Sequence, residues 1–280
     1  MSARIRTVSE RCQIPAATLR MWERRYGFPA PQRTGGNYRE YSEDDIAQIL
    51  RVKTLLATGL VASEAIAQVR LHGAAHLSQE AVKQLRSSFL EAAQRMAERS
   101  LEEIAQLARK GLEAWDFCEL FALPLLRALS SEALDIAREH LASSVLRQQM
   151  REALYQLSSP AQSKVVILAC PEGEEHEGGL IAIAIRLRVL GQRVVLLGAN
   201  TPANAVAAAC VGTHVDAIGL SFVEPRDEAF VKDFLTTVIA ACPGVPVFAG
   251  GPFSRKHLRT VFAAGAQFAE SADELLAACL

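Results

Sequence analysis

A carboxylate and an imidazole two residues apart are the side chains best suited to bind a metal. They are Glu174 and His176, and Gly179 completes the pattern Glu-x-His-x-x-Gly. An imidazole can ligate a metal through one ring nitrogen while a carboxylate accepts a hydrogen bond from the other, which fixes the tautomer and raises the basicity of the ligand. Gly179 would let a ligand pass close to the backbone. The alternative is a charged, solvated loop that binds nothing.

The elements around this loop predict a parallel sheet. Residues 164–169 form a short apolar, β-branched run typical of a buried strand, and a helical pattern at 180–190 follows the loop. Further strands are predicted at 193–197, 217–221, 246–249 and 267–269, with helices between and after them. We therefore expect a doubly wound, Rossmann-like α/β domain over residues 163–280. Ligands of such domains bind at the carboxyl ends of the strands, where the loop lies.

Three motifs of this domain resemble those of cobalamin-binding domains, which share D-x-H-x-x-G, then S-x-L, then G-G. Here Glu174 replaces the aspartate, and the later motifs are Ser221-Phe222-Val223 and Gly250-Gly251. The resemblance implies that His176 is the lower axial ligand of the cobalt in adenosylcobalamin or methylcobalamin. The other implied cofactor-binding residues here are Glu174, Gly179, Ser221, Val223, Gly250 and Gly251. An unrelated flavodoxin-like domain is the alternative.

A second candidate site is predicted near the N-terminus, where positive charge is concentrated. The first 42 residues carry eight arginines and three glutamates, a balance of +5, whereas the whole chain has a net charge of -1. Such a concentration is typical of nucleic-acid-binding modules, although a solvated basic face would have the same charge. Two short helices, at 8–12 with Thr7 and Ser9 as caps and at 16–26, predict a helix-turn-helix whose second helix enters the major groove.

The segment that follows predicts a wing, with a polar loop at 32–37 between two short strands. A capping-box pattern of Ser42 and Asp45 then begins a helix at 43–58, and another helix is expected at 62–69. The stretches ATLRMWERRYG (17–27) and NYREYS (37–42) resemble the recognition helix and wing of the MerR family. The resemblance implies a winged-helix domain over residues 1–72, with Trp22 and Tyr41 in its core. Its implied DNA-binding residues are Thr18, Arg20, Arg24, Tyr38 and Arg39.

The middle of the chain, residues 78–158, has apolar residues at helical spacing and predicts a four-helix bundle. A MerR-type domain, a bundle and a cobalamin-type domain, in this order, resemble the light-responsive repressors of the CarA/CarH/LitR group. In that group adenosylcobalamin lies between bundle and sheet and promotes an operator-binding tetramer, and light cleaves the cobalt–carbon bond and releases DNA. Glu139 and His140 match the end of the group's W-x9-EH motif, which implies that they bind the cofactor. Leu129 stands where that motif has tryptophan.

Composition and absent motifs exclude other classes. The six cysteines form no C-x-x-C pair, which argues against a zinc ribbon and a disulfide framework and favours a reducing cytoplasm. Neither a signal peptide nor an apolar run of transmembrane length is present. We find no Ser-His-Asp set, Walker loop or paired catalytic carboxylates, and we expect no enzyme.

Together these features predict a DNA-binding transcription regulator, a repressor by resemblance. We expect a homo-oligomer, dimer or tetramer, that binds double-stranded operator DNA under the control of a cobalamin. One alternative is a ligand-independent MerR-type regulator whose degenerate cobalamin domain serves assembly or partner binding. The other is a corrinoid protein that carries methyl groups.

Overall fold

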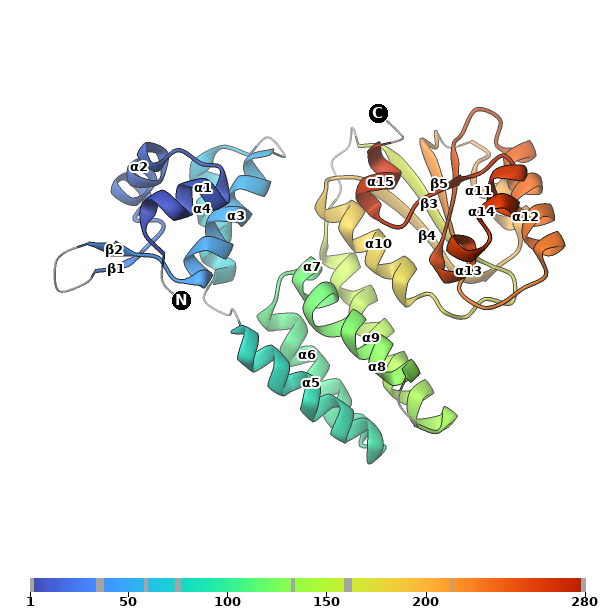
Figure 1. Ribbon diagram of the computed structural model, residues 1–280, viewed down its shortest axis with the longest axis horizontal. Coiled ribbons are helices and arrows are strands. Elements are labelled where there is room, and N and C mark those ends of the chain that lie inside the picture. Colours follow the sequence, from blue (N-terminus) through green and yellow to red (C-terminus); the bar gives the residue numbers. More distant parts are fainter. Residues whose placement is uncertain are drawn as a thin grey trace. The chain divides into compact units, whose positions relative to one another are not determined.

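The computed structural model describes residues 3–33, 38–57, 60–73, 77–131, 134–158, 163–212 and 214–277. The chain divides into two compact units, Met1–Gln79 and Glu80–Leu280 (Figure 1). The second unit contains both the helical bundle and the sheet. Within the described residues, no helix is both long and apolar enough to cross a membrane.

The first unit is a helical domain with a small two-stranded sheet. Its elements are α1 (Ile5–Cys12), α2 (Ala16–Tyr26), β1 (Gln32–Arg33), β2 (Arg39–Glu40), α3 (Glu43–Ala57) and α4 (Ala62–Gly73). The strands β1 and β2 are antiparallel, as a wing requires, and the predicted loop tip at 34–37 lies outside the described residues. Trp22 and Tyr41 are buried in the core of this unit, as predicted.

The sequence predicts the starts of two helices in this unit, the first wrongly and the second correctly. Helix α1 begins at Ile5, before the predicted residue 8, so Thr7 and Ser9 lie inside it and their predicted capping role is wrong. The Ser9 hydroxyl instead donates to the Ile14 carbonyl at 2.7 Å and closes the turn after the helix. The capping box of α3 is confirmed, because the Asp45 carboxylate accepts from the Ser42 N–H at 2.7 Å and the Ser42 hydroxyl accepts from the Asp45 N–H at 3.0 Å.

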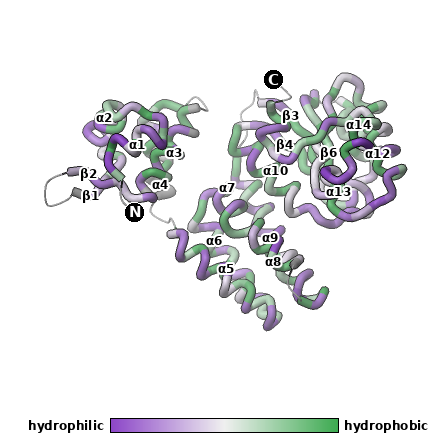
Figure 2. The backbone as a smooth tube through the Cα atoms, in the orientation of Figure 1, coloured by the Kyte–Doolittle hydropathy of each residue, from purple (hydrophilic) through white to green (hydrophobic). Residues whose placement is uncertain are grey.

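The bundle of the second unit is built from four helical segments in the described part of the chain. They are α5 (Gln79–Gln94), α6 (Glu98–Gly111), the run α7 (Ala114–Asp116), η1 (Phe117–Ala122) and α8 (Leu123–Ser131), and α9 (Ile136–Gln156). Hydrophobic and hydrophilic residues alternate along α5 and α6 (Figure 2), as expected of helices with one buried face. Phe89, Phe117 and Phe121 are fully buried in the bundle core, where Phe121 stacks on Phe117 and meets Phe89 edge to face.

A five-stranded parallel sheet with the order β4-β3-β5-β6-β7 forms the rest of this unit, which confirms the doubly wound prediction. The strands are β3 (Val165–Pro171), β4 (Arg193–Thr201), β5 (Ala217–Ser221), β6 (Val247–Gly250) and β7 (Gln267–Phe268). The helices are α10 (Gly178–Val189), α11 (Ala203–Ala209), α12 (Glu228–Ala241), α13 (Gly251–Lys256), α14 (Leu258–Ala263) and α15 (Ala272–Ala277).

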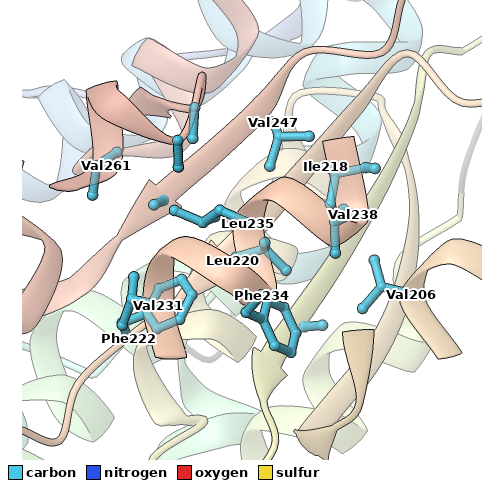
Figure 3. Close-up of a cluster of buried hydrophobic side chains, with 14 of the residues drawn as sticks. Val206, Ile218, Leu220, Phe222, Val231, Phe234, Leu235, Val238, Val247 and Val261 are labelled. Carbon is cyan, nitrogen blue, oxygen red and sulfur yellow. The ribbon is translucent and has the colours of Figure 1, made fainter. Parts of the chain in front are cut away.

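Helix α10 joins the sheet to the bundle. It contacts β3 and β4 on one side and α7, α8 and α9 on the other (Figure 1). A helix enclosed in this way must be apolar around most of its circumference, and the sequence of α10, GGLIAIAIRLRV, satisfies that requirement. On the opposite face of the sheet, Val231, Phe234, Leu235 and Val238 of α12 pack against residues of β5 such as Leu220 (Figure 3).

Two glycines with positive φ allow a prediction about stability. The φ of Gly251 is +91°, and a Cβ atom there would lie 2.3 Å from the Phe222 carbonyl oxygen. Gly244 has a similar φ of +81°, but nothing lies within 4 Å of its Cβ position. We expect Gly244→Ala to cost about 1–2 kcal/mol through backbone strain alone. Gly251→Ala should cost at least about 2 kcal/mol more, because backbone must also move. Urea unfolding measures both, and equal losses would contradict this close approach.

Candidate functional site

The candidate metal-binding histidine lies on the loop after β3 and is held by a buried carboxylate. Glu174 is fully buried, and its Oε1 accepts hydrogen bonds from the backbone N–H and the ring Nδ1 of His176, both at 3.0 Å. Its Oε2 accepts from the backbone N–H groups of Val223 at 3.0 Å and Glu224 at 2.8 Å, both just beyond β5. The hydrogen bond expected between Glu174 and His176 is therefore present.

This environment keeps Glu174 ionised. Burial by itself raises the pKa of the carboxyl group, but hydrogen bonds from the backbone of Glu224, His176 and Val223, and from the His176 ring, outweigh burial and hold the pKa below its ordinary value. Because an ionised carboxylate can only accept, it favours the tautomer with the proton on Nδ1. That tautomer places the free lone pair of His176 on Nε2.

The edge of the His176 ring that carries Nε2 is available to a ligand. The side chain is 52% exposed, and within the described residues Nε2 has no hydrogen-bond partner. No group of three or more His, Cys, Asp or Glu residues in the described parts of the chain could hold a metal ion. His176 therefore offers a single ligand, which suits a metal whose other positions are filled by its own macrocycle. These observations fit the cobalt of a corrinoid.

Two further side chains brace the loop. Asn200, at the end of β4, accepts a hydrogen bond from the Gly173 N–H at 2.8 Å, and its own N–H donates to the Glu174 carbonyl at 2.9 Å. Arg226 donates to the Glu172 carbonyl at 2.8 Å and lies 3.7 Å from the Glu174 carboxylate. Neither residue was predicted from the sequence. Asn200 lies at the carboxyl end of β4, and a polar side chain at that place is the one signal that would have identified it.

The remaining predicted residues of this site lie around the same edge of the sheet. Ser221 and Gly250 are register partners in β5 and β6, and Val223 reaches the site through its backbone N–H. A Cβ atom at Gly250 would lie 2.7 Å from the Ala269 carbonyl oxygen, so close backbone packing requires Gly250, as it does Gly251. Gly179 differs, because nothing lies within 4 Å of its Cβ position. An open position there leaves room for a ligand, and the Ser254 hydroxyl, buried just after the glycine pair, has no partner among the described residues.

The predicted residues of the bundle are not joined to this site by any hydrogen bond or ion pair among the described residues. Glu139 and His140 lie near the start of α9. The His140 Nε2 atom is 3.8 Å from the Glu139 Oε2 atom, and the His140 side chain is 72% exposed. Leu129, at the position of the absent tryptophan, is buried in the bundle. Trp115 cannot replace that tryptophan, because its ring stacks against Arg186, about 12 Å along α10 from Gly178 at a rise of 1.5 Å per residue.

The candidate DNA-binding surface lies on α2 and the wing. Arg20 and Arg24 are exposed on α2, Thr18 is half-buried and Tyr38 is exposed beside β2. Arg39 is engaged by the recognition helix, because its Nε lies 2.6 Å from the Glu23 carboxylate. This ion pair ties the wing strand to α2, so Arg39 braces the predicted interface as well as being a predicted phosphate contact.

Comparisons with known proteins match two parts of the chain to known families. Residues 3–69 match the model of the MerR HTH family of regulatory proteins, and residues 164–279 match that of the B12 binding domain. The solved structure of the monomethylamine corrinoid protein from Methanosarcina barkeri shares the fold of the second unit, with a TM-score of 0.54 and 16% identity over 71% of this chain and 98% of that one. These findings define the class as a MerR-type regulator with a B12-binding domain.

Two relatives that match at least nine-tenths of this chain identify its family within that class. The HTH-type transcriptional repressor CarA of Myxococcus xanthus is 41% identical over 99% of this chain and 96% of its own length. The HTH-type transcriptional repressor CarH of the same organism is 34% identical over 91% of this chain and 90% of its own length. The chain belongs to the CarA/CarH family of transcriptional repressors. Members are regulators rather than enzymes, as predicted, and the methyl-carrier alternative finds no support in these relatives.

A substitution tests how strongly the loop depends on the buried carboxylate. Glu174→Ala should lower the free energy of unfolding of the second unit by about 3 kcal/mol or more. It leaves three backbone N–H groups unpaired and the Arg226 charge uncompensated. Urea unfolding of the full chain measures the loss. The neighbouring exposed Glu175 is the control, since Glu175→Ala should change stability by less than about 0.5 kcal/mol. Similar effects of the two substitutions would contradict the assigned role.

Proposed function

We propose that this protein is a transcriptional repressor whose assembly and operator binding are controlled by a cobalamin. The observation that carries the proposal is the buried Glu174 carboxylate, which orients His176 and leaves Nε2 exposed in a chain that begins with a MerR-type domain. The B12-binding match and the family of repressors support it. We place its action in the cytoplasm, where DNA and cobalamin are both accessible.

The residues of the second unit hold and orient the cofactor in this proposal. His176 would bind the cobalt through Nε2 and Glu174 would fix the tautomer of His176, while Gly179, Ser221, Val223, Gly250 and Gly251 would hold the cofactor and its nucleotide tail. Glu139 and His140 would contact the cofactor from the bundle. A bound alkylcobalamin supplies a cobalt–carbon bond that light can break, and we extend the proposal to light-dependent release of DNA.

The first unit binds the operator. Arg20 and Arg24 on α2 contact phosphates beside the major groove, Thr18 lies nearer the bases, and Tyr38 and Arg39 reach the backbone from the wing. One such unit covers a half-site, so binding to a repeated or palindromic operator requires a dimer or tetramer. A ligand that binds one assembly state more tightly shifts the population toward that state, which links cofactor to DNA.

A ligand-independent regulator is the second candidate. The buried Leu129 and the Trp115–Arg186 stack favour it, because the described bundle offers no tryptophan to cover the upper face of a corrin. The candidates differ in one observable, the binding of a corrinoid by the purified full chain.

Substitution of the candidate ligand tests the cofactor half of the proposal. The visible spectrum of methylcobalamin mixed with the protein in darkness should change on binding, and His176→Ala should abolish the histidine-bound spectrum and weaken binding at least about tenfold. His214→Ala, which removes an exposed histidine at another edge of the sheet, should behave like the parent. A parent protein that binds neither methylcobalamin nor adenosylcobalamin would establish the ligand-independent candidate instead.

Salt dependence tests the DNA half. Each phosphate contact contributes about 0.9 to the slope of log K against log salt concentration. Arg20→Ala should therefore weaken duplex binding and lower that slope by about one. Arg99→Ala removes an exposed arginine of the bundle, paired with Glu103, and should leave both quantities unchanged. Fluorescence anisotropy with operator-containing DNA at several salt concentrations measures them. An unchanged slope for Arg20→Ala would remove α2 from the interface.

A further inference from the structure

The residue directly after His176 carries an ion pair to the bundle. Glu177 is 8% exposed, and its Oε2 lies 2.6 Å from Nη2 of Arg151 on α9, while Nε of the same arginine donates to Oε1 at 3.3 Å. The two contacts form a fork, the geometry in which arginine binds a carboxylate most specifically. A helix of the bundle thus holds the histidine loop through one side chain.

The backbone at the end of β4 accommodates the Arg151–Glu177 ion pair. The Ala199 N–H donates to Glu177 Oε2 at 3.1 Å, so the carboxylate has donors from both the bundle and the sheet. The β3–β4 register is irregular at this point, where Ala169 pairs with Gly198 rather than with the expected residue 197. The φ of Gly198 is +91°, and a Cβ atom there would lie 3.1 Å from both Arg151 Nη2 and Glu177 Oε2.

A second contact joins the bundle to the next residue of the loop. A Cβ atom at Gly178 would lie 2.6 Å from Cδ1 of Leu126, so α8 packs directly on the first residue of α10. The two residues after His176 are therefore each fixed by a different bundle helix. Glu177 also occupies the N-cap position of α10, so both bundle contacts lie where the histidine loop enters that helix.

We propose that the Arg151–Glu177 ion pair and the Leu126–Gly178 contact form a junction that couples the position of the bundle to the presentation of His176. Arg151 and Glu177 are positioning residues in this arrangement. A ligand bound at His176 is then held by a loop whose displacement the bundle resists, and displacement of the bundle moves the ligand-binding histidine. The inference rests on the proposed function for the role of His176, but the coupling itself is a property of the protein without ligand.

The first experiment uses the ligand-free full chain. Glu177→Gln keeps the size of the side chain, but an amide has only one acceptor oxygen and no charge, so the fork from Arg151 Nε and Nη2 to two carboxylate oxygens is lost. Amide hydrogen exchange should accelerate about tenfold at the start of α10, in the loop and in the second half of α9. The matched control is Glu152→Gln, one residue from Arg151 on α9, because Glu152 pairs with Arg109 at 3.0 Å inside the bundle. The control should accelerate exchange in α6 and α9 but leave the loop unchanged.

Binding of methylcobalamin in darkness provides the second readout. Glu177→Gln should weaken binding by about tenfold or more and lower the fraction with the histidine-bound spectrum, as loss of partners that orient a ligand does at metal sites. Arg151→Lys keeps the charge without the fork and should give an intermediate loss. Gly178→Ala, which displaces Leu126 without changing any charge, should reproduce the effect of Glu177→Gln.

The two readouts separate the junction from the proposed function. If the parent binds no cobalamin, the proposed function fails, and hydrogen exchange still decides whether the junction exists. If Glu177→Gln leaves exchange in the loop at the parent rate, or matches Glu152→Gln throughout, the junction is overturned. If exchange accelerates but methylcobalamin keeps its parent affinity and spectrum, the contacts stabilise the bundle without controlling His176, and the proposal is equally overturned.

Discussion

A charged carboxylate without contact to solvent is the constraint on which the second unit depends. Glu174 is fully buried, and an ionised group in that position is tolerable only when it is surrounded by donors. The donors come from its own loop and from the segment after β5, and Arg226 approaches from the same segment. The requirements of one charge therefore fix the position of the loop relative to two adjacent strands. The imidazole of His176 is oriented as part of that arrangement.

The same physics extends from the loop into the bundle. Glu177, one residue beyond His176, is likewise a buried carboxylate surrounded by hydrogen-bond donors. One of its donors is a backbone N–H of the sheet, and the other is Arg151 of α9. Helix α10 then separates bundle and sheet by a single apolar layer, so the bundle cannot be an independent spacer. A carboxylate on each side of the histidine, each satisfied by a different part of the unit, gives a surface-exposed ring a rigid support.

Much of this arrangement could be predicted from the sequence. Alternation of apolar runs and helical patterns identified the five strands, and the three motifs fall at the carboxyl ends of β3, β5 and β6 as expected for a parallel sheet. The start of α1 was predicted wrongly, because Thr7 and Ser9 are good capping residues by type but both lie inside the helix, where the Ser9 hydroxyl closes the following turn. Arg151, Asn200 and Arg226 were not found, since their roles arise from tertiary packing and from the irregular end of β4. The glycines were assigned to a ligand slot, whereas Gly250 and Gly251 are already required by neighbouring backbone.

The two units depend on different physical interactions. The first has its own core and presents exposed arginines on one helix, so its contribution to DNA binding is electrostatic and each copy contributes a separate share. The second depends on angles and distances around one loop, which a ligand can stabilise or strain. Under the proposed function, connecting the two requires no rearrangement of the DNA-binding helix itself. Assembly of second units raises the effective concentration of the attached first units at neighbouring half-sites, which can strengthen binding by 10²–10⁴-fold without any new contact to DNA. A repressor built in this way needs a ligand site that is rigid enough to discriminate between assembly states, and the buried carboxylates on either side of His176 provide that rigidity.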